Sequence, residues 1–320
     1  MAFKDGYISI LCIIPCPLRP RFNRIFEEYL EEYNRSASLP IYCPSLEGMS
    51  CDDAEELLEG ARTREDLPEL IVATAGHGTF SHNFRSRFVE TGLYEPCVPE
   101  GFHTSLPVSL KGEMDRHKIG LLAASGWSCL LDQSVDSESP LPGSWLDLAD
   151  PCYAGEICLH GCDETVSNTA LLYRILKARG EAGLEQFARN VTGVKHFSRI
   201  IKAMDSSSPE RSRFSIMPGA AATQIPRHKR VAMLDFAEGP LFAPLQVLAA
   251  RETRGCREEP LAFFYGEDFR KLLTLGGYIM ADEISPDHSF VLPDYDHILS
   301  RGYEDETEEL KRRFSGYLVS

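Results

Sequence analysis

Short unbroken apolar runs alternate along the chain with segments in which apolar residues recur at helical spacing. Residues 7–14 form the first run and predict a buried strand, and Phe22, Phe26 and Leu30 then fall on one face of a predicted helix. The order repeats at 70–74, where a second apolar run precedes a glycine-containing loop and another helix. This alternation indicates an α/β fold with a largely parallel sheet.

The same pattern continues toward the C-terminus. Further strands are predicted at 156–160, 214–217, 231–236 and 245–250, and further helices at 161–178, 182–190, 197–204, 260–275 and 303–317. Ligands of open α/β sheets bind beyond the carboxyl ends of the strands. This rule selects the loops at 15–19, 75–78, 160–165, 217–223 and 236–240 as places for a site.

Charge and hydropathy exclude several classes of protein. The 320 residues are enough for two domains or one large α/β unit. The formal net charge of −15 argues against binding to nucleic acid or to anionic membrane surfaces. No stretch approaches the ~20 apolar residues of a membrane helix, so no membrane insertion is expected.

The N-terminal apolar run does not have the features of an export signal. It begins just after Lys4 and Asp5, is closed by Pro15 and Pro17, and lacks a cationic leader and a small-residue cleavage site. The sequence therefore predicts a cytoplasmic protein. Its ten cysteines are then expected to be thiols, and without a C-x-x-C pair they do not indicate an ordinary zinc site.

Three segments resemble the substrate-binding proteins of ABC importers, near the ferric-ion-binding branch. They are the strand, loop and helix of 8–33, the helix pair of 164–190, and residues 144–159, which read Ser-Trp-Leu-Asp-Leu-Ala-Asp-Pro-Cys-Tyr-Ala-Gly-Glu-Ile-Cys-Leu. The turn Glu238-Gly239-Pro240 is similar to the return strand of that family. The loop Pro15-Cys16-Pro17-Leu18-Arg19 is also similar to that of signal-less members from anaerobic bacteria.

This resemblance implies a two-lobed fold of the type 2 periplasmic-binding-protein class, with a ligand cleft between the lobes. Lobe one is expected at 1–115 and 232–265, and lobe two at 118–228, with the C-terminal helices of 266–320 packing back on lobe two. Ferric-binding relatives hold iron with a tyrosine pair before the return crossing. Residues 216–223 contain no tyrosine, so tyrosinate-bound iron is not expected.

Two candidate ligand loops follow strands of the first lobe. In one, Arg19 can clamp a carboxylate or oxyanion and Cys16, beside Pro17, can bind a soft metal as thiolate. The other loop contains Thr74, Gly76, His77 and Gly78. Its glycines let a ligand approach the backbone, and the helix that follows offers free N–H groups. His77 can also bind a metal. The alternatives are a rigid turn with a space-filling cysteine and an ordinary strand–helix turn.

The second lobe supplies the remaining candidates. His160, Cys162 and Glu164 suit a transition metal, while Thr165 offers a backbone amide at a helix start capped by Cys162 or Asp163. An ordinary capped helix is the alternative. Four other residues complete the set: Met217 and Gly219 can offer backbone contacts, the ring of Trp127 can stack on a flat ligand, and Glu238 is a minor candidate ligand. The alternatives are hinge packing for Met217 and Gly219, a position in the core for Trp127, and a return turn for Glu238.

The predicted function is a cytoplasmic solute-binding protein without catalysis. Its two lobes close around one small ligand, which is a metal ion, a metal complex or a small anion, and it acts as a carrier, buffer or sensor. No cofactor is identified beyond a transition-metal ion or complex. One alternative is a cofactor- or metal-related enzyme on the same fold, with His77, Cys16 and Cys162 as its chemical groups. Another is a protein that docks a partner through its acidic C-terminal segment.

Overall fold

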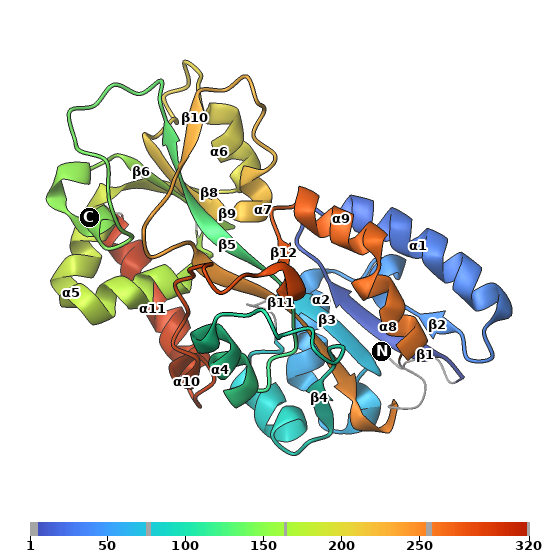
Figure 1. Ribbon diagram of the computed structural model, residues 1–320. Helices are drawn as coiled ribbons and strands as arrows, with labels where there is room; N and C mark the ends of the chain where they lie inside the picture. Colours follow the sequence, from blue (N-terminus) through green and yellow to red (C-terminus); the bar gives the residue numbers. More distant parts are fainter. Residues whose placement is uncertain (1–5, 75–77, 163–164, 254–257, 319–320) are drawn as a thin grey trace. The chain divides into compact units, whose positions relative to one another are not determined.

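The computed structural model describes residues 6–74, 78–162, 165–253 and 258–318. These residues form two compact units (Figure 1). Unit 1 comprises Met1–Ser125, Ala243–His288 and Asp294–Tyr303, and unit 2 comprises Gly126–Phe242, Ser289–Pro293 and Glu304–Ser320. Two of the boundaries between the units fall inside β5 (Leu121–Asp132) and β11 (Leu241–Ala250), and the others follow His288, Pro293 and Tyr303.

Unit 1 contains a mixed sheet. Strand β1 (Ile8–Ile13) pairs in parallel with β2 (Ile41–Tyr42) and β3 (Leu70–Thr74). Strand β11 runs antiparallel to β3 and to β4 (Tyr94–Pro96), and β12 (Ile279–Met280) runs antiparallel to β5. The helices are α1 (Arg19–Ser36), α2 (Cys51–Gly60), α3 (His82–Phe84), α4 (Val108–Arg116), α8 (Glu258–Tyr265), α9 (Glu267–Leu275) and α10 (Tyr295–Ile298).

Helix α1 packs through the face that the apolar spacing predicts. Phe22, Phe26 and Leu30 are buried, and they recur every four positions, about one helical turn. The ring centroid of Phe22 lies 6.0 Å from that of Phe269, which brings α1 beside α9 (Figure 1). Burying each such ring stabilises the fold by about 1.5–3 kcal/mol.

Unit 2 contains a second set of parallel strands. Strand β6 (Ile157–Cys162) pairs in parallel with β8 (Val191–Lys195) and β9 (Phe214–Pro218), and in antiparallel with β7 (Thr165–Val166). Strands β9 and β10 (Val231–Leu234) both run antiparallel to β5. The helices are α5 (Thr169–Asn190), α6 (Phe197–Ala203), α7 (Gly219–Ala222) and α11 (Tyr303–Leu318), and α5 packs on α11 with Phe187 and Phe314 5.8 Å apart.

The prediction of a largely parallel sheet is correct only for the strands around β1 and around β6. Parallel pairing needs a long crossover connection, and α1 supplies one between β1 and β2 while α5 supplies one between β6 and β8. Strands β5 and β11 pair in antiparallel with their neighbours in these units.

Several boundaries predicted from the sequence differ from the structure. Residues 232–242, expected in lobe one, belong to unit 2, where β10 pairs with β5. Residues 266–320 do not group as one set with the second lobe, because the aromatic packing of α9 on α1 assigns it to unit 1. The helix predicted to open at 161–165 begins instead at Thr169, where the Asn168 side chain accepts from the Leu171 amide at 3.0 Å. Gly161 permits the β6–β7 turn, since a Cβ atom there would lie 2.0 Å from the Thr165 carbonyl oxygen.

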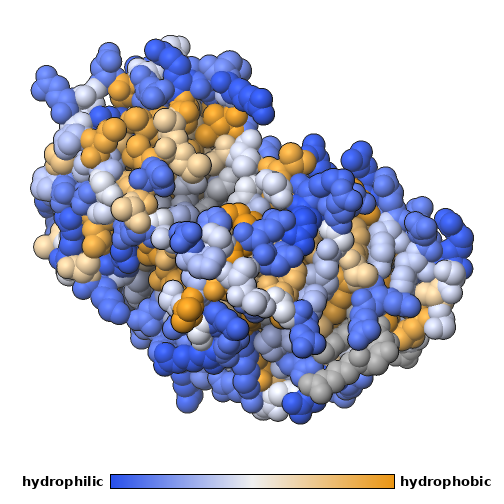
Figure 2. Space-filling view, viewed as in Figure 1, coloured by the Kyte–Doolittle hydropathy of each residue, from blue (hydrophilic) through white to orange (hydrophobic). Residues whose placement is uncertain are grey.

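The face shown in Figure 2 carries mostly hydrophilic residues, with groups of hydrophobic ones between them. Across the parts of the chain that the structure describes, no helix has the length and apolar character needed to span a bilayer.

Candidate functional site

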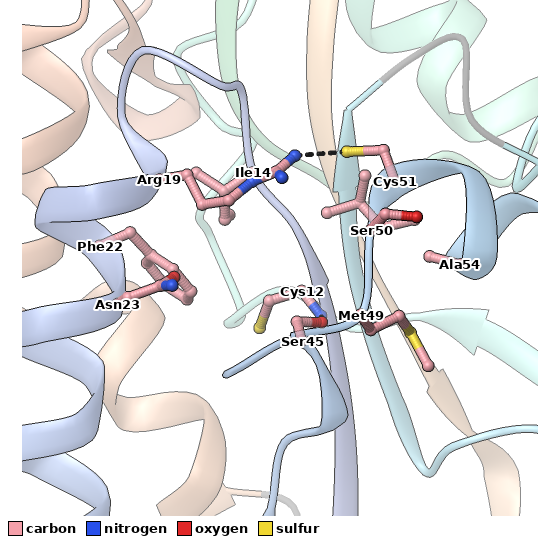
Figure 3. A pocket seen from close by; sticks show the side chains of 11 residues that line it. Cys12, Ile14, Arg19, Phe22, Asn23, Ser45, Met49, Ser50, Cys51 and Ala54 are labelled. Carbon is pink, nitrogen blue, oxygen red and sulfur yellow. Dashed lines mark hydrogen bonds between the residues drawn. The ribbon is translucent and has the colours of Figure 1, made fainter. Parts of the chain in front are cut away.

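A hollow lies in unit 1 at the carboxyl end of β1, between the first turns of α1 and α2 (Figure 3). It is a shallow hollow, partly open to solvent, whose volume of about 10 Å³ has room for roughly one water molecule. Its described lining residues are Cys12, Ile13, Ile14, Arg19, Phe22, Asn23, Ser45, Met49, Ser50, Cys51 and Ala54. The position agrees with the rule that ligands bind beyond the carboxyl ends of strands.

The loop after β1 directs Arg19 into this hollow. The Pro15 carbonyl accepts from the amides of Leu18 and Arg19 at 2.9 and 3.1 Å, which closes a tight turn before α1. Pro20 then occupies the first turn of the helix, where its missing N–H costs nothing. Arg19 is thus the first residue of α1, and Figure 3 shows its side chain extending toward Cys51.

Arg19 contacts sulfur atoms in this structure. Its Nη2 atom donates to Cys51 Sγ and lies 3.7 Å from Cys16 Sγ. Thiol sulfur is a weak acceptor, whereas a carboxylate or phosphate oxygen is a strong one for a guanidinium group. Among the described lining residues Arg19 is the only charged one. The hollow therefore has a local positive charge in a protein whose net charge is −15.

The opposite wall is the start of α2. Ser50 and Asp53 form a reciprocal cap: the Asp53 amide donates to Ser50 Oγ at 3.0 Å, and the Ser50 amide donates to Asp53 Oδ2 at 2.8 Å. The cap fixes Cys51 as the first residue of the helix, at the end where the helix dipole is positive. Below it, Ser45 Oγ accepts from the Cys12 amide at 3.1 Å.

Two pairs of thiols lie around the hollow. Cys16 hydrogen-bonds with Cys51, and this contact, followed by burial, raises the pKa of the Cys51 thiol well above its usual range, while Arg19 acts to lower it. Cys12 hydrogen-bonds with Cys43, and burial is the largest cause that raises the Cys12 pKa. Cys16 is exposed, whereas Cys12 and Cys43 are 6% and 3% exposed.

The second predicted loop of this unit follows β3. Thr74 is half-buried at the end of the strand, and Gly76 and His77 lie outside the described residues. Gly78 is buried against α2: a Cβ atom there would lie 2.9 Å from Leu58 Cβ, so close packing accounts for this glycine.

Unit 2 has a smaller hollow beside β6, which is too tight to hold a water molecule. Trp127, His160 and Asn168 line it with apolar neighbours, and the rings of Trp127 and His160 are 5.9 Å apart. Burial lowers the pKa of His160 to about 4, against a smaller rise from the backbone of Lys195. Its Nδ1 atom and the Nδ2 atom of Asn168 are buried without a partner among the described residues.

The other candidates of unit 2 are dispersed. Cys162 and Thr165 are exposed and pair with each other between β6 and β7, and Glu164 lies outside the described residues. Met217 is fully buried, which leaves its side chain in the core, and Gly219 starts the four-residue helix α7. Within 6–74, 78–162, 165–253 and 258–318, no group of three His, Cys, Asp or Glu side chains can hold a metal ion.

Glu238 has partners inside unit 2. One carboxylate oxygen accepts from the Trp145 amide at 2.8 Å, and the other pairs with Arg174. This arrangement corresponds to the return-turn interpretation of Glu238.

Several residues of the two hollows were not among the predicted candidates. Cys51, Ser45, Asn23 and Asn168 come from segments that carry no ligand motif. The Ser50-x-x-Asp53 spacing was the available signal for the start of α2, since a residue that accepts at the N-cap marks a helix N-terminus.

Comparison with known proteins agrees with this architecture. The chain aligns over 96% of its length with an ABC transporter protein from Clostridium perfringens, at 10% identity, 99% coverage of that chain and a TM-score of 0.66. The ferric iron-binding protein A of Mannheimia haemolytica aligns with 97% of this chain at 13% identity, with 99% coverage of its own chain and a TM-score of 0.62. The spermidine/putrescine ABC transporter substrate-binding protein of Streptococcus pneumoniae aligns with 98% of this chain at 12% identity, with 100% coverage of its own chain and a TM-score of 0.59.

These similarities confirm the α/β fold of two-lobed periplasmic binding proteins that the sequence predicts. No curated protein is similar to the chain in sequence. Residues 65–301, however, match the family described as bacterial extracellular solute-binding protein. The match covers well over half of the 320 residues. The chain therefore belongs to this solute-binding protein family.

Proposed function

We propose that the protein binds a small oxyanion or carboxylate solute, with Arg19 as the charged contact in the hollow of unit 1. The observation that carries the proposal is that Arg19 is half-buried in a hollow where it is the only charged described lining residue, and that the acceptors it meets among the described residues are weak sulfur atoms. Family membership supports a small-molecule ligand but leaves its chemistry open. The similar structures include proteins named for ferric iron and for polyamines.

An oxyanion in this hollow gains several favourable contacts. It replaces the thiols as the acceptor for the guanidinium group, and a hydrogen bond between charged partners contributes about 1.5–3 kcal/mol. The start of α2 contributes no net attraction, because Asp52 and Asp53 in its first turn offset the positive end of the helix dipole. Asn23 and Ser45 supply neutral polar groups at the same hollow.

We predict that Arg19→Gln weakens anion binding roughly tenfold, because it removes a charge-assisted contact without emptying the hollow. Calorimetric titration with phosphate, sulfate, citrate and succinate, followed by the variant with whichever anion binds, measures the effect. Metal ions and spermidine are titrated in parallel.

Arg24→Gln is the matched control, since Arg24 is an exposed arginine on the same helix, and it should keep wild-type affinity. Thermal unfolding of both variants checks that the fold is retained. Tight binding of a cation with unchanged affinity in Arg19→Gln contradicts the proposal.

We also propose that the protein acts in the cytoplasm as a carrier, buffer or sensor. The support is its content of ten cysteines, including two pairs of neighbouring thiols in one region, which a reducing compartment preserves. Fractionation of the source cells should recover the protein with cytoplasmic markers. Recovery in the envelope or the medium contradicts this location.

A further inference from the structure

We propose that Cys16 and Cys51 form a reversible disulfide by exchange with a low-molecular-weight disulfide such as oxidised glutathione. The two cysteines come from different segments, the loop after β1 and the first turn of α2. Their side chains hydrogen-bond with each other, and one nitrogen atom of Arg19 contacts both sulfur atoms. The inference does not depend on which solute the protein binds.

The surroundings give the two sulfur atoms different roles. Cys16 is exposed, so an incoming disulfide can reach it, and Arg19, which contacts both sulfur atoms, stabilises negative charge on whichever of them is deprotonated. Cys51 is partly buried and holds its proton in the hydrogen bond with Cys16. Cys16 is therefore the attacking sulfur and Cys51 the resolving one.

The exchange balances in two steps. The Cys16 thiolate attacks one sulfur of oxidised glutathione, which forms a mixed disulfide and releases one glutathione thiolate. Cys51 then loses its proton to solvent and attacks the Cys16 sulfur, which forms the Cys16–Cys51 bond and releases the second glutathione. Two protein thiols are oxidised and one glutathione disulfide is reduced to two thiols. Excess reduced glutathione reverses both steps.

The Cys12–Cys43 pair provides an internal comparison in the same unit. These thiols also hydrogen-bond with each other, but both are buried and an external disulfide cannot reach them. Burial raises the pKa of Cys12, whereas at Cys43 burial is outweighed by hydrogen bonds that lower its pKa, so it is the burial of both sulfur atoms and not their acidity that prevents exchange. Proximity is thus common to both pairs, and accessibility together with Arg19 distinguishes Cys16–Cys51.

The test is to equilibrate the purified full-length protein in glutathione redox buffers, trap thiols with N-ethylmaleimide in denaturant, and map peptides by mass spectrometry. The expected product is a Cys16–Cys51 cross-linked peptide that reverts with reduced glutathione, while Cys12 and Cys43 are recovered alkylated. In Cys51→Ser the mixed glutathione disulfide should accumulate on Cys16. Arg19→Gln should slow the first step by roughly threefold to tenfold, because fewer Cys16 thiolates are present.

Cys152→Ser is the matched control, since it removes an exposed cysteine of unit 2 and should leave the cross-link unchanged. The proposal is overturned if Cys16 and Cys51 each carry glutathione without joining. It is also overturned if Cys12–Cys43 oxidises as readily, or if the cross-link joins two copies of the chain. No solute is present in this experiment, so it stands apart from the titrations with anions.

Discussion

Replacing Trp145 by alanine is expected to lower the free energy of unfolding of unit 2 by about 3–5 kcal/mol. The Trp145 ring is 1% exposed and meets the ring of Phe236 edge to face at 5.0 Å. Its indole N–H donates to the Gly239 carbonyl at 2.9 Å, in a buried hydrogen bond. The substitution therefore leaves a large cavity and an unpaired carbonyl oxygen at once.

Urea unfolding followed by circular dichroism measures this effect. Trp145→Phe keeps an aromatic ring but loses the indole donor, so we expect an intermediate loss of stability. Trp127→Ala is the matched control: it removes the other of the two tryptophans, which is only half-buried, and should cost clearly less. Equal losses at the two positions would show that the interactions of Trp145 are not what stabilises the unit.

Trp145 also explains why part of the fold could be predicted from the sequence. The Trp-Leu-Asp-Leu-Ala-Asp-Pro segment and the Glu238-Gly239-Pro240 turn were recognised separately, and they contact each other through Trp145. Gly239 takes a positive φ of 83°, and a Cβ atom there would lie 2.1 Å from the Ser289 carbonyl oxygen. These residue types are strongly constrained by local geometry, so they carry a signal that a single sequence shows.

The candidate site was predictable only in part. A proline-rich loop after a buried strand pointed to Cys16 and Arg19, because strand ends of α/β sheets gather at one edge. Cys51 lies 32 positions from Arg19, and nothing in its own segment indicates that the two side chains meet. Their contact depends on the β1–β2 crossover and on the start of α2, which are tertiary features.

The region of 161–165 shows how a local pattern can mislead. Its polar residues resemble a helix start, yet Thr165 and Val166 are β-branched and pair with Cys162 and Gly161 instead. The helix then begins at Asn168, which is also a strong N-cap residue. Sequence spacing alone did not distinguish between the two caps.

His160 is expected to make the stability of unit 2 depend on pH in mildly acidic solution. Burial holds its pKa at about 4 in the folded protein, compared with 6.5 in the unfolded chain. Between these values the unfolded chain takes up a proton at His160 that the folded protein does not. The free energy of unfolding is therefore highest above pH 6.5 and falls toward pH 4, by about 2–3 kcal/mol from this residue.

The contribution is measured as a difference between proteins, because carboxylates also titrate in this range. Urea unfolding of the wild type and His160→Phe at several pH values should give a shallower decline in the variant, whose ring remains compatible with neighbouring Trp127 and Phe197. Phe197→Leu is the control, since it disturbs the same aromatic group without removing the imidazole and should keep the wild-type slope. Parallel declines in wild type and His160→Phe would mean that the imidazole is accessible to protons in the folded state, and hence that the hollow beside β6 is open to water.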